Sequence, residues 1–250
     1  MMTFGVIAEG ATDQAVIKSI LLGFFQGTTE ELVIRPIQPP SPTPSEPAPQ
    51  GNWQHVFHCL KRGDAQEVLD YTHFLVVHID TDVQEEPGFD VPRRDGTREL
   101  TVFERVARVI DRLIRDIGPA FVQEEGHRIL FAIAVDSIEC WLLPLLYNNK
   151  KAEKTTGCEG AANAELRKKN RKGLSAGDTK FRHAYTEASR DYRTRKILLN
   201  KAKKNPSLEI FLQRLEALQS RLTANDPGAS PGDGKASPEG ENPPESIASE

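Results

Sequence analysis

The chain contains three short hydrophobic runs, at residues 4–8, 74–80 and 128–135. They are rich in β-branched and aromatic side chains and are bounded by polar residues, a pattern typical of strands that are covered on both faces. Such strands occur in parallel sheets, where helices connect one strand to the next. Residues 32–37 also fit a strand, although Pro36 weakens its last part.

Between these runs, hydrophobic residues recur at helical spacing. In the first such segment Thr12 is the expected N-cap, and Asp13 suits the positive end of a helix. The alternation of strands and helices predicts an α/β fold with an open, mostly parallel sheet flanked by helices. Helices are expected after residue 12 and at residues 53–60, 102–117, 136–146, 181–200 and 208–222.

The composition divides the 250-residue chain into three parts. Residues 1–149 hold the predicted strands and form the expected α/β core. Within this core, residues 38–52 are rich in proline and serine and predict a surface loop, and residues 83–100 predict a long polar loop in a position where lids often occur. Residues 150–223 predict a basic helical extension, and residues 224–250 a disordered acidic tail.

The net charge of −4 hides an asymmetry. Residues 150–204 contain 17 Lys and Arg but 6 Asp and Glu, whereas residues 224–250 contain one Lys and 6 acidic residues. Residues 150–180 are also polar and glycine-bearing, so we expect partial disorder there. A basic segment before an acidic tail favours contact with a polyanion. The side chains that we expect to contact nucleic acid are Lys168, Lys169, Arg171, Lys172, Lys180 and Lys196.

The three cysteines, Cys59, Cys140 and Cys158, are scattered and form no CxxC pair. This spacing argues against a disulfide framework and a structural zinc, and it fits a reducing cytoplasm. The sequence lacks a hydrophobic run of about 18 residues, so no membrane span is expected. The N-terminus shows neither a basic leader nor a cleavage-site pattern. A cytoplasmic location is therefore predicted.

Acidic residues follow each of the three hydrophobic strands. Asp80 and Asp82 follow the central one, Glu9 the first, and Asp136 and Glu139 the third. Ligands bind at the carboxyl ends of strands in open α/β sheets, and residues two apart in an extended chain point the same way. Carboxylates gathered there repel one another unless a divalent cation neutralises them. Oxygen ligands suit Mg²⁺ or Mn²⁺, and the chemistry expected is phosphoryl transfer or phosphodiester hydrolysis.

Five stretches occur in an order that resembles the Toprim domain, above all the small stand-alone Toprim-like proteins related to the OLD and RloB nuclease groups. The first three hold the acidic residues, and the last two are similar to the helical end of those proteins. The resemblance covers residues 3–220 apart from the proline-rich loop and the basic stretch. The stretches are EGATD (9–13), HIDTD (78–82), SIECWLLPLL (137–146), FRHAYTEAS (181–189) and NPSLEIFLQRL (205–215).

The resemblance implies that Glu9 is a general acid/base or a metal ligand. It implies that Asp80 and Asp82 hold Mg²⁺ or Mn²⁺ and that Glu139 is a supporting ligand. It also implies a nuclease acting on DNA or RNA and, because some members sit beside ATPases in phage-defence systems, a defence role with an ATPase partner. The wider Toprim pattern often has a third acid two residues after the DxD pair. Gln84 occupies that position here, so two metal ions are not implied.

Several of these residues also have structural explanations. Aspartates are common in turns that follow strands, and Glu139 lies three residues after Asp136, as in a capping box. Asp13 is expected to interact with the helix dipole, and His78 to be a core or supporting histidine. The basic stretch can be a solvated face.

Two other functions stay open. A DTD motif after a strand also occurs in haloacid-dehalogenase phosphatases, but these have Thr or Val four residues after the first Asp, where this chain has Gln84. That alternative also leaves Glu9-Gly10 unexplained. The third possibility is a non-catalytic recognition or regulatory subunit, with a decayed site, that docks on an ATPase. The oligomeric state is open as well, with a homo-oligomer among the alternatives.

Overall fold

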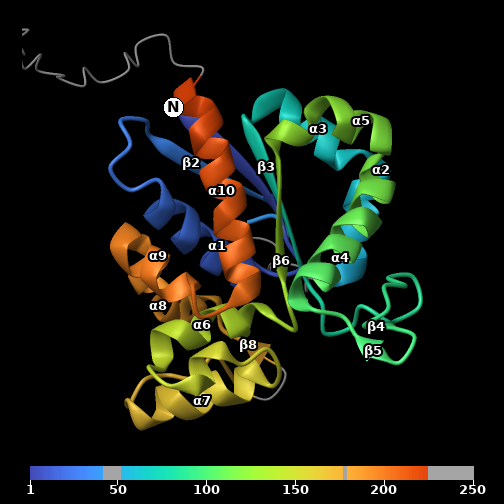
Figure 1. The fold of residues 1–250 in the computed structure, drawn as a ribbon. Helices are drawn as coiled ribbons and strands as arrows, with labels where there is room; N and C mark the ends of the chain where they lie inside the picture. Colours follow the sequence, from blue (N-terminus) through green and yellow to red (C-terminus); the bar gives the residue numbers. More distant parts are fainter. Residues whose placement is uncertain (42–51, 177–178, 225–250) are drawn as a thin grey trace, which may run out of the picture.

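The protein is described by a computed structural model that covers residues 1–41, 52–176 and 179–224 (Figure 1). Four parallel strands form one sheet in the order β2-β1-β3-β6, which confirms the predicted α/β class. Two short antiparallel hairpins, β4-β5 and β7-β8, lie outside this sheet. The strands are β1 Met2–Ile7, β2 Leu32–Gln38, β3 Phe74–Asp80, β4 Arg94–Asp95, β5 Arg98–Glu99, β6 Ile129–Ala134, β7 Ser175–Ala176 and β8 Thr179–Lys180.

Helices cover both faces of the sheet (Figure 1). Helices α2, α3 and α4 pack on one face, whereas α1, α6, α8, α9 and α10 lie on the other, and α7 packs against α6. None of the helices in the described residues combines the length and hydrophobicity that crossing a membrane requires. The helices are α1 Ala11–Phe24, α2 Trp53–Arg62, α3 Asp64–Tyr71, α4 Val102–Ile117, α5 Pro119–Glu125, α6 Ile138–Leu146, α7 Cys158–Lys168, α8 Arg182–Ala188, α9 Arg195–Ala202 and α10 Pro206–Ala224.

Strand β3 is buried along its whole length, as its hydrophobic run predicts. Phe74 and Val76 face the cluster that contains α1 and α6, and Leu75 and Val77 face the cluster that contains α2 and α4. Side chains alternate along a strand, so the even-numbered residues that follow Val76 also point toward α1 and α6. This alternation decides the surroundings of the functional residues at the end of β3.

The segment at 181–200, predicted as one helix, is instead divided into α8, a 3₁₀ turn and α9. Ser189 lies at the break, where its hydroxyl donates to the Tyr185 carbonyl at 2.8 Å and contacts Ser19 Oγ at 2.9 Å. A side-chain hydroxyl that binds the backbone in this way competes with the helical hydrogen bonds. The break turns the chain so that Tyr192 enters the core.

The prediction of partial disorder at 150–180 is wrong for the residues that the structure describes. Helix α7 buries Ala162 and Leu166 in the same cluster as α1 and α6. The spacing of the cysteines argued against a disulfide framework, yet Cys140 of α6 and Cys158 of α7 form a disulfide. The two are 18 residues apart, so only the packing of α7 on α6 brings them together. Cys59 is free and buried.

The predicted polar loop at 83–100 contains a hydrophobic anchor and the β4-β5 hairpin. Phe89 is fully buried, and its ring centroid lies 5.5 Å from that of Trp53 and 5.0 Å from that of Phe57. Arg112 of α4 donates from Nη2 to the Gly88 carbonyl at 2.9 Å. The loop is therefore packed against α2 and α4. Most of the predicted proline-rich loop (42–51) and of the tail (225–250) lies outside the described residues.

Gly23 of α1 lets the helix approach the 3₁₀ turn Arg190–Arg193 closely. A Cβ atom at this position would lie 1.8 Å from the backbone oxygen of Tyr192. We therefore expect Gly23→Ala to lower the free energy of unfolding by about 1–3 kcal/mol, because α1 and the turn must separate. Urea denaturation measures this change.

The matched control is Gly160→Ala in α7, where no described atom lies within 4 Å of the added Cβ. This helical substitution should leave the stability unchanged or raise it by up to about 1 kcal/mol. Equal stability of Gly23→Ala and the wild type would contradict the close packing of α1 on the turn.

Candidate metal centre

The carboxyl ends of β1 and β3 are joined by a hydrogen bond through an acidic side chain. The backbone N–H of Asp80 donates to Glu9 Oε1 at 2.7 Å. Glu9 follows β1, and Asp80 is the last residue of β3. The predicted meeting of these two residues at one edge of the parallel sheet is thus confirmed.

The start of α1 adds a third carboxylate to this edge. Gly10, not the predicted Thr12, is the N-cap of α1, since the helix begins at Ala11 directly after the turn. Asp13 accepts hydrogen bonds from the Gly10 backbone N–H at 2.7 Å and from the Thr12 hydroxyl at 3.1 Å. These bonds fix the buried Asp13 carboxylate above the ends of the strands.

Asp13, His78 and Asp80 form a compact group of possible metal ligands. One ligand atom of each lies within 4.8 Å of the others, and all three residues are buried. Nε2 of His78 lies 3.3 Å from Asp80 Oδ1, and Nδ1 lies 2.7 Å from the Ala132 carbonyl oxygen. The sequence pattern favoured structural roles for Asp13 and His78. The EGATD and HIDTD stretches contain both residues, but local spacing does not show that they meet.

The pKa of Glu9 is raised well above its usual range. Burial is the largest cause, and the carboxylates of Asp80 and Asp13 add to it. The Asp80 N–H bond and His78 act in the opposite direction. A carboxyl group with a raised pKa can hold a proton closer to neutral pH, which suits a general acid/base.

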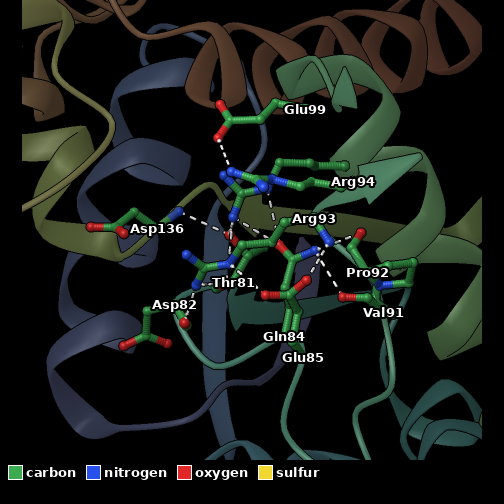
Figure 2. A network of polar contacts seen from close by, with 11 residues as sticks. Thr81, Asp82, Gln84, Glu85, Val91, Pro92, Arg93, Arg94, Glu99 and Asp136 are labelled. Carbon is green, nitrogen blue, oxygen red and sulfur yellow. Dashed lines mark hydrogen bonds and ion pairs between the residues drawn. The ribbon is translucent and has the colours of Figure 1, made fainter. Parts of the chain in front are cut away.

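Asp82 lies beyond the end of β3, in the turn that follows. The extended conformation that was expected to direct Asp80 and Asp82 the same way ends at Asp80. The Asp82 side chain is exposed, and Figure 2 shows its carboxylate pointing away from the guanidinium of Arg93. Asp82 therefore faces solvent and is not part of the buried group of Asp13, His78 and Asp80.

Glu139 lies in the first turn of α6 and is almost completely buried. The hydroxyl of Tyr185, from α8, donates a short hydrogen bond to its Oε1. Burial raises the pKa of Tyr185, and the nearby Glu139 carboxylate raises it further. The N-cap of α6 is Ser137, not the Asp136 of the predicted capping box.

Asp136 has a left-handed backbone, with φ at 68°, between β6 and α6. Burial raises the pKa of its carboxyl group, whereas Arg93 and Arg105 lower it. Asp136 also forms a second group with Cys140 and Cys158, whose ligand atoms lie within 4.8 Å of one another. The two sulfur atoms are bonded to each other, so in this state they are not thiolate ligands.

A network of hydrogen bonds holds the turn after β3 (Figure 2). Thr81 Oγ1 accepts from the Asp136 N–H at 2.9 Å and from Arg105 Nη2 at 2.7 Å. Arg105 also donates to Gln84 Oε1, at 2.7 Å from Nη2 and 3.0 Å from Nε. Arg93 donates to the backbone oxygens of Thr81 and Asp82. Gln84, at the position of the third acid in the Toprim pattern, is thus a buried structural residue.

The predicted nucleic-acid contacts occupy exposed positions where their side chains are described. Lys168 lies on α7, and Lys169, Arg171 and Lys172 follow it directly, in the part of the molecule next to α6 (Figure 1). Lys196 lies on α9. Their local contacts are to neutral groups as well as acids: Lys169 Nζ donates to the Leu146 carbonyl at 2.8 Å, and Lys172 Nζ lies 4.3 Å from the Phe181 ring centroid. The exposed residues are Lys168, Lys169, Arg171, Lys172 and Lys196; the side chain of Lys180 lies outside the description.

The Arg105 network predicts a large loss of stability on truncation. Arg105→Met leaves the Thr81 hydroxyl and the buried Gln84 carbonyl without their charged donor, so we expect the free energy of unfolding to fall by about 1.5–3 kcal/mol. Arg94→Met is the control, because its ion pair with Glu99 is exposed and should contribute less than about 1 kcal/mol. Equal urea midpoints for the two variants would contradict this assignment.

The raised pKa of Glu9 predicts that Glu9→Gln stabilises the metal-free protein. Above the unfolded pKa of about 4.3 the unfolded chain loses the Glu9 proton more readily than the folded chain, so the native carboxyl group destabilises the fold as pH rises. Gln keeps an oxygen for the Asp80 N–H bond. With a chelator at pH 7 we expect the free energy of unfolding to rise by on the order of 1 kcal/mol.

This gain should vanish near pH 4, where the Glu9 carboxyl group is protonated in both states. The exposed Glu216→Gln is the control and should not change the stability at either pH. A loss of stability in Glu9→Gln at pH 7 would show that the Glu9 carboxylate does not destabilise the folded protein.

No protein-family model matches this chain, and the searches of the curated proteins and of the solved structures each yield no match.

Proposed function

We propose that this protein is a Mg²⁺- or Mn²⁺-dependent nuclease of the Toprim type, which hydrolyses phosphodiester bonds of DNA or RNA. The observation that supports the proposal most strongly is the meeting of Glu9 with Asp80, which is itself grouped with Asp13 in a buried position. Three carboxyl groups packed this closely favour either proton uptake or a bound divalent cation.

The residues present fit a divalent cation. Asp13 and Asp80 offer carboxylate oxygens within a group whose atoms are 4.8 Å apart or less, and Glu9 is joined to the Asp80 backbone. The buried Nε2 of His78 points into the same group. When bound, the cation would polarise the phosphate and lower the pKa of the attacking water. Asp82 and Glu139 stay proposed as further ligands, although neither belongs to a group of possible ligands among the described residues.

Glu9 is the proposed general acid/base. It is half-buried, it accepts the Asp80 N–H bond through Oε1, and its raised pKa brings proton exchange closer to neutral pH. Because the same hydrogen bond links β1 to β3, Glu9 is held in a fixed position while it exchanges the proton. The role needs only one carboxyl oxygen, and the other stays available.

The positive charge on and after α7 is the reason for proposing a nucleic-acid substrate. Exposed basic side chains on and after α7, including Lys168 and Lys172, would neutralise the phosphate backbone of a nucleic acid. A role in phage defence with an ATPase partner is part of the proposal through the Toprim resemblance. The cytoplasmic setting also stays a proposal, although disulfides such as Cys140–Cys158 are more typical of oxidising compartments.

Cleavage of supercoiled plasmid and of single-stranded RNA tests the proposal, with Mg²⁺, with Mn²⁺ and with a chelator. We expect metal-dependent cleavage by the wild type and a loss of about 10²–10⁴-fold in Glu9→Gln, because the general acid/base is removed. Asp80→Asn should lose cleavage as well, since it removes a ligand charge.

The control is Asp111→Asn, which makes the same chemical change on the exposed face of α4 and should keep full activity. Cleavage that persists in Asp80→Asn would show that the reaction takes place at another site. A folded wild type that cleaves neither substrate under any of the three conditions would favour the non-catalytic subunit.

A further inference from the structure

The buried ring of His78 is held in one orientation. The residue is completely buried in β3, and its ring lies edge-on to Trp141 of α6, with 6.0 Å between centroids. It shares a strand face with Asp80, two residues on. Nδ1 lies 2.7 Å from the Ala132 carbonyl oxygen in the neighbouring strand β6. The imidazole is therefore held both by its packing against Trp141 and by the contact at one nitrogen.

The contact with Ala132 determines which nitrogen carries the proton. A carbonyl oxygen only accepts hydrogen bonds, so Nδ1 is the donor. In the neutral imidazole, Nε2 then has a lone pair and no hydrogen. Among the residues that the structure describes, none forms a hydrogen bond with Nε2. This atom is directed at Asp80 Oδ1, another electron-pair donor, across 3.3 Å.

The lone pairs of His78 Nε2 and Asp80 Oδ1 repel each other at this distance, unless a positively charged group or ion lies between or beside them. Asp13 adds a further negative oxygen within 4.8 Å. A metal ion bound by His78 Nε2 and Asp80 converts the repulsion into two ligand bonds. A backbone carbonyl that holds the other N–H is the usual support of a metal-binding histidine, because it fixes the tautomer and the ring orientation.

We propose that His78 is a nitrogen ligand of the metal in this site and that the site therefore selects a first-row transition-metal ion over Mg²⁺. The inference rests on the proposed metal site, but it does not require nuclease activity. Mg²⁺ demands oxygen ligands and keeps several waters, whereas imidazole nitrogen is a good ligand for transition-metal ions. The site would thus bind Mn²⁺ in preference to Mg²⁺.

Pulsed electron paramagnetic resonance of Mn²⁺ bound to the full-length wild type tests the proposal directly. We expect a coupling between the Mn²⁺ electron spin and a ¹⁴N nucleus, which changes when the protein is made with ¹⁵N-histidine. The coupling should be absent in His78→Gln and present in His55→Gln, a control on the exposed face of α2. The wild-type spectrum shows whether a histidine nitrogen binds the ion, and His78 is the histidine that the described residues place in a group of possible ligands. The two variants assign the nitrogen to His78.

Titration calorimetry of the same proteins gives the selectivity. We expect His78→Gln to weaken Mn²⁺ binding by about 10–100-fold and to change Mg²⁺ binding much less. Bound Mn²⁺ without a nitrogen coupling would overturn the inference but leave the metal site intact. Failure of the wild type to bind Mn²⁺ would overturn both. A nitrogen coupling in a protein without nuclease activity would support the inference and reject only the proposed reaction.

Discussion

Parallel pairing of β1, β3 and β6 is the constraint on which the site depends. Strands that run in the same direction end at the same edge, so residues that follow Ile7, Ile79 and Ala134 must meet there, although they are far apart in the chain. Pairing β1 with β3 in this register brings Glu9 to the Asp80 N–H. The acidic residues of the site meet because the hydrophobic strands between them pair.

The burial that stabilises the strands also raises the free energy of the carboxylates at their carboxyl ends. Strand β3 is covered on both faces, so its last residue lies in a region of low polarity, where like charges repel strongly. Part of the cost is offset by donors to individual carboxylates, such as the Gly10 N–H that binds Asp13. The rest appears as the raised pKa of Glu9. A cation bound at the proposed site would reduce that remaining cost.

Helices from the C-terminal part of the chain pack around the carboxyl ends of the strands. Tyr185 of α8 binds the Glu139 carboxylate, and the disulfide between Cys140 and Cys158 attaches α7 to α6. Helices from the 150–223 segment contribute to the same hydrophobic cluster as α1 and β6. The Arg105 network, in contrast, comes from α4 on the other side of the sheet. The site is therefore enclosed from both faces.

Local patterns along the chain identify which segments form the sheet and which acidic residues lie at the ends of its strands. Unbroken hydrophobic runs and helical spacing are local patterns, and they located β1, β3, β6, α4 and α10 closely. Glu9 and Asp80 were identifiable for the same reason, since Glu9 follows shortly after a recognisable strand and Asp80 ends one. The Toprim resemblance and the implied chemistry stay predictions.

The strand order, the disulfide and the full set of residues around the carboxyl ends of the strands follow from three-dimensional packing and are not visible in local patterns. Asp13 and His78 have ordinary local explanations, and they become candidate ligands because α1 starts above the end of β3 and because alternation turns His78 toward that helix. Asp82 was expected to act with Asp80, yet the chain leaves the extended conformation between them. Such contacts depend on non-local packing, and hydrophobic periodicity describes only the neighbours of a residue along the chain.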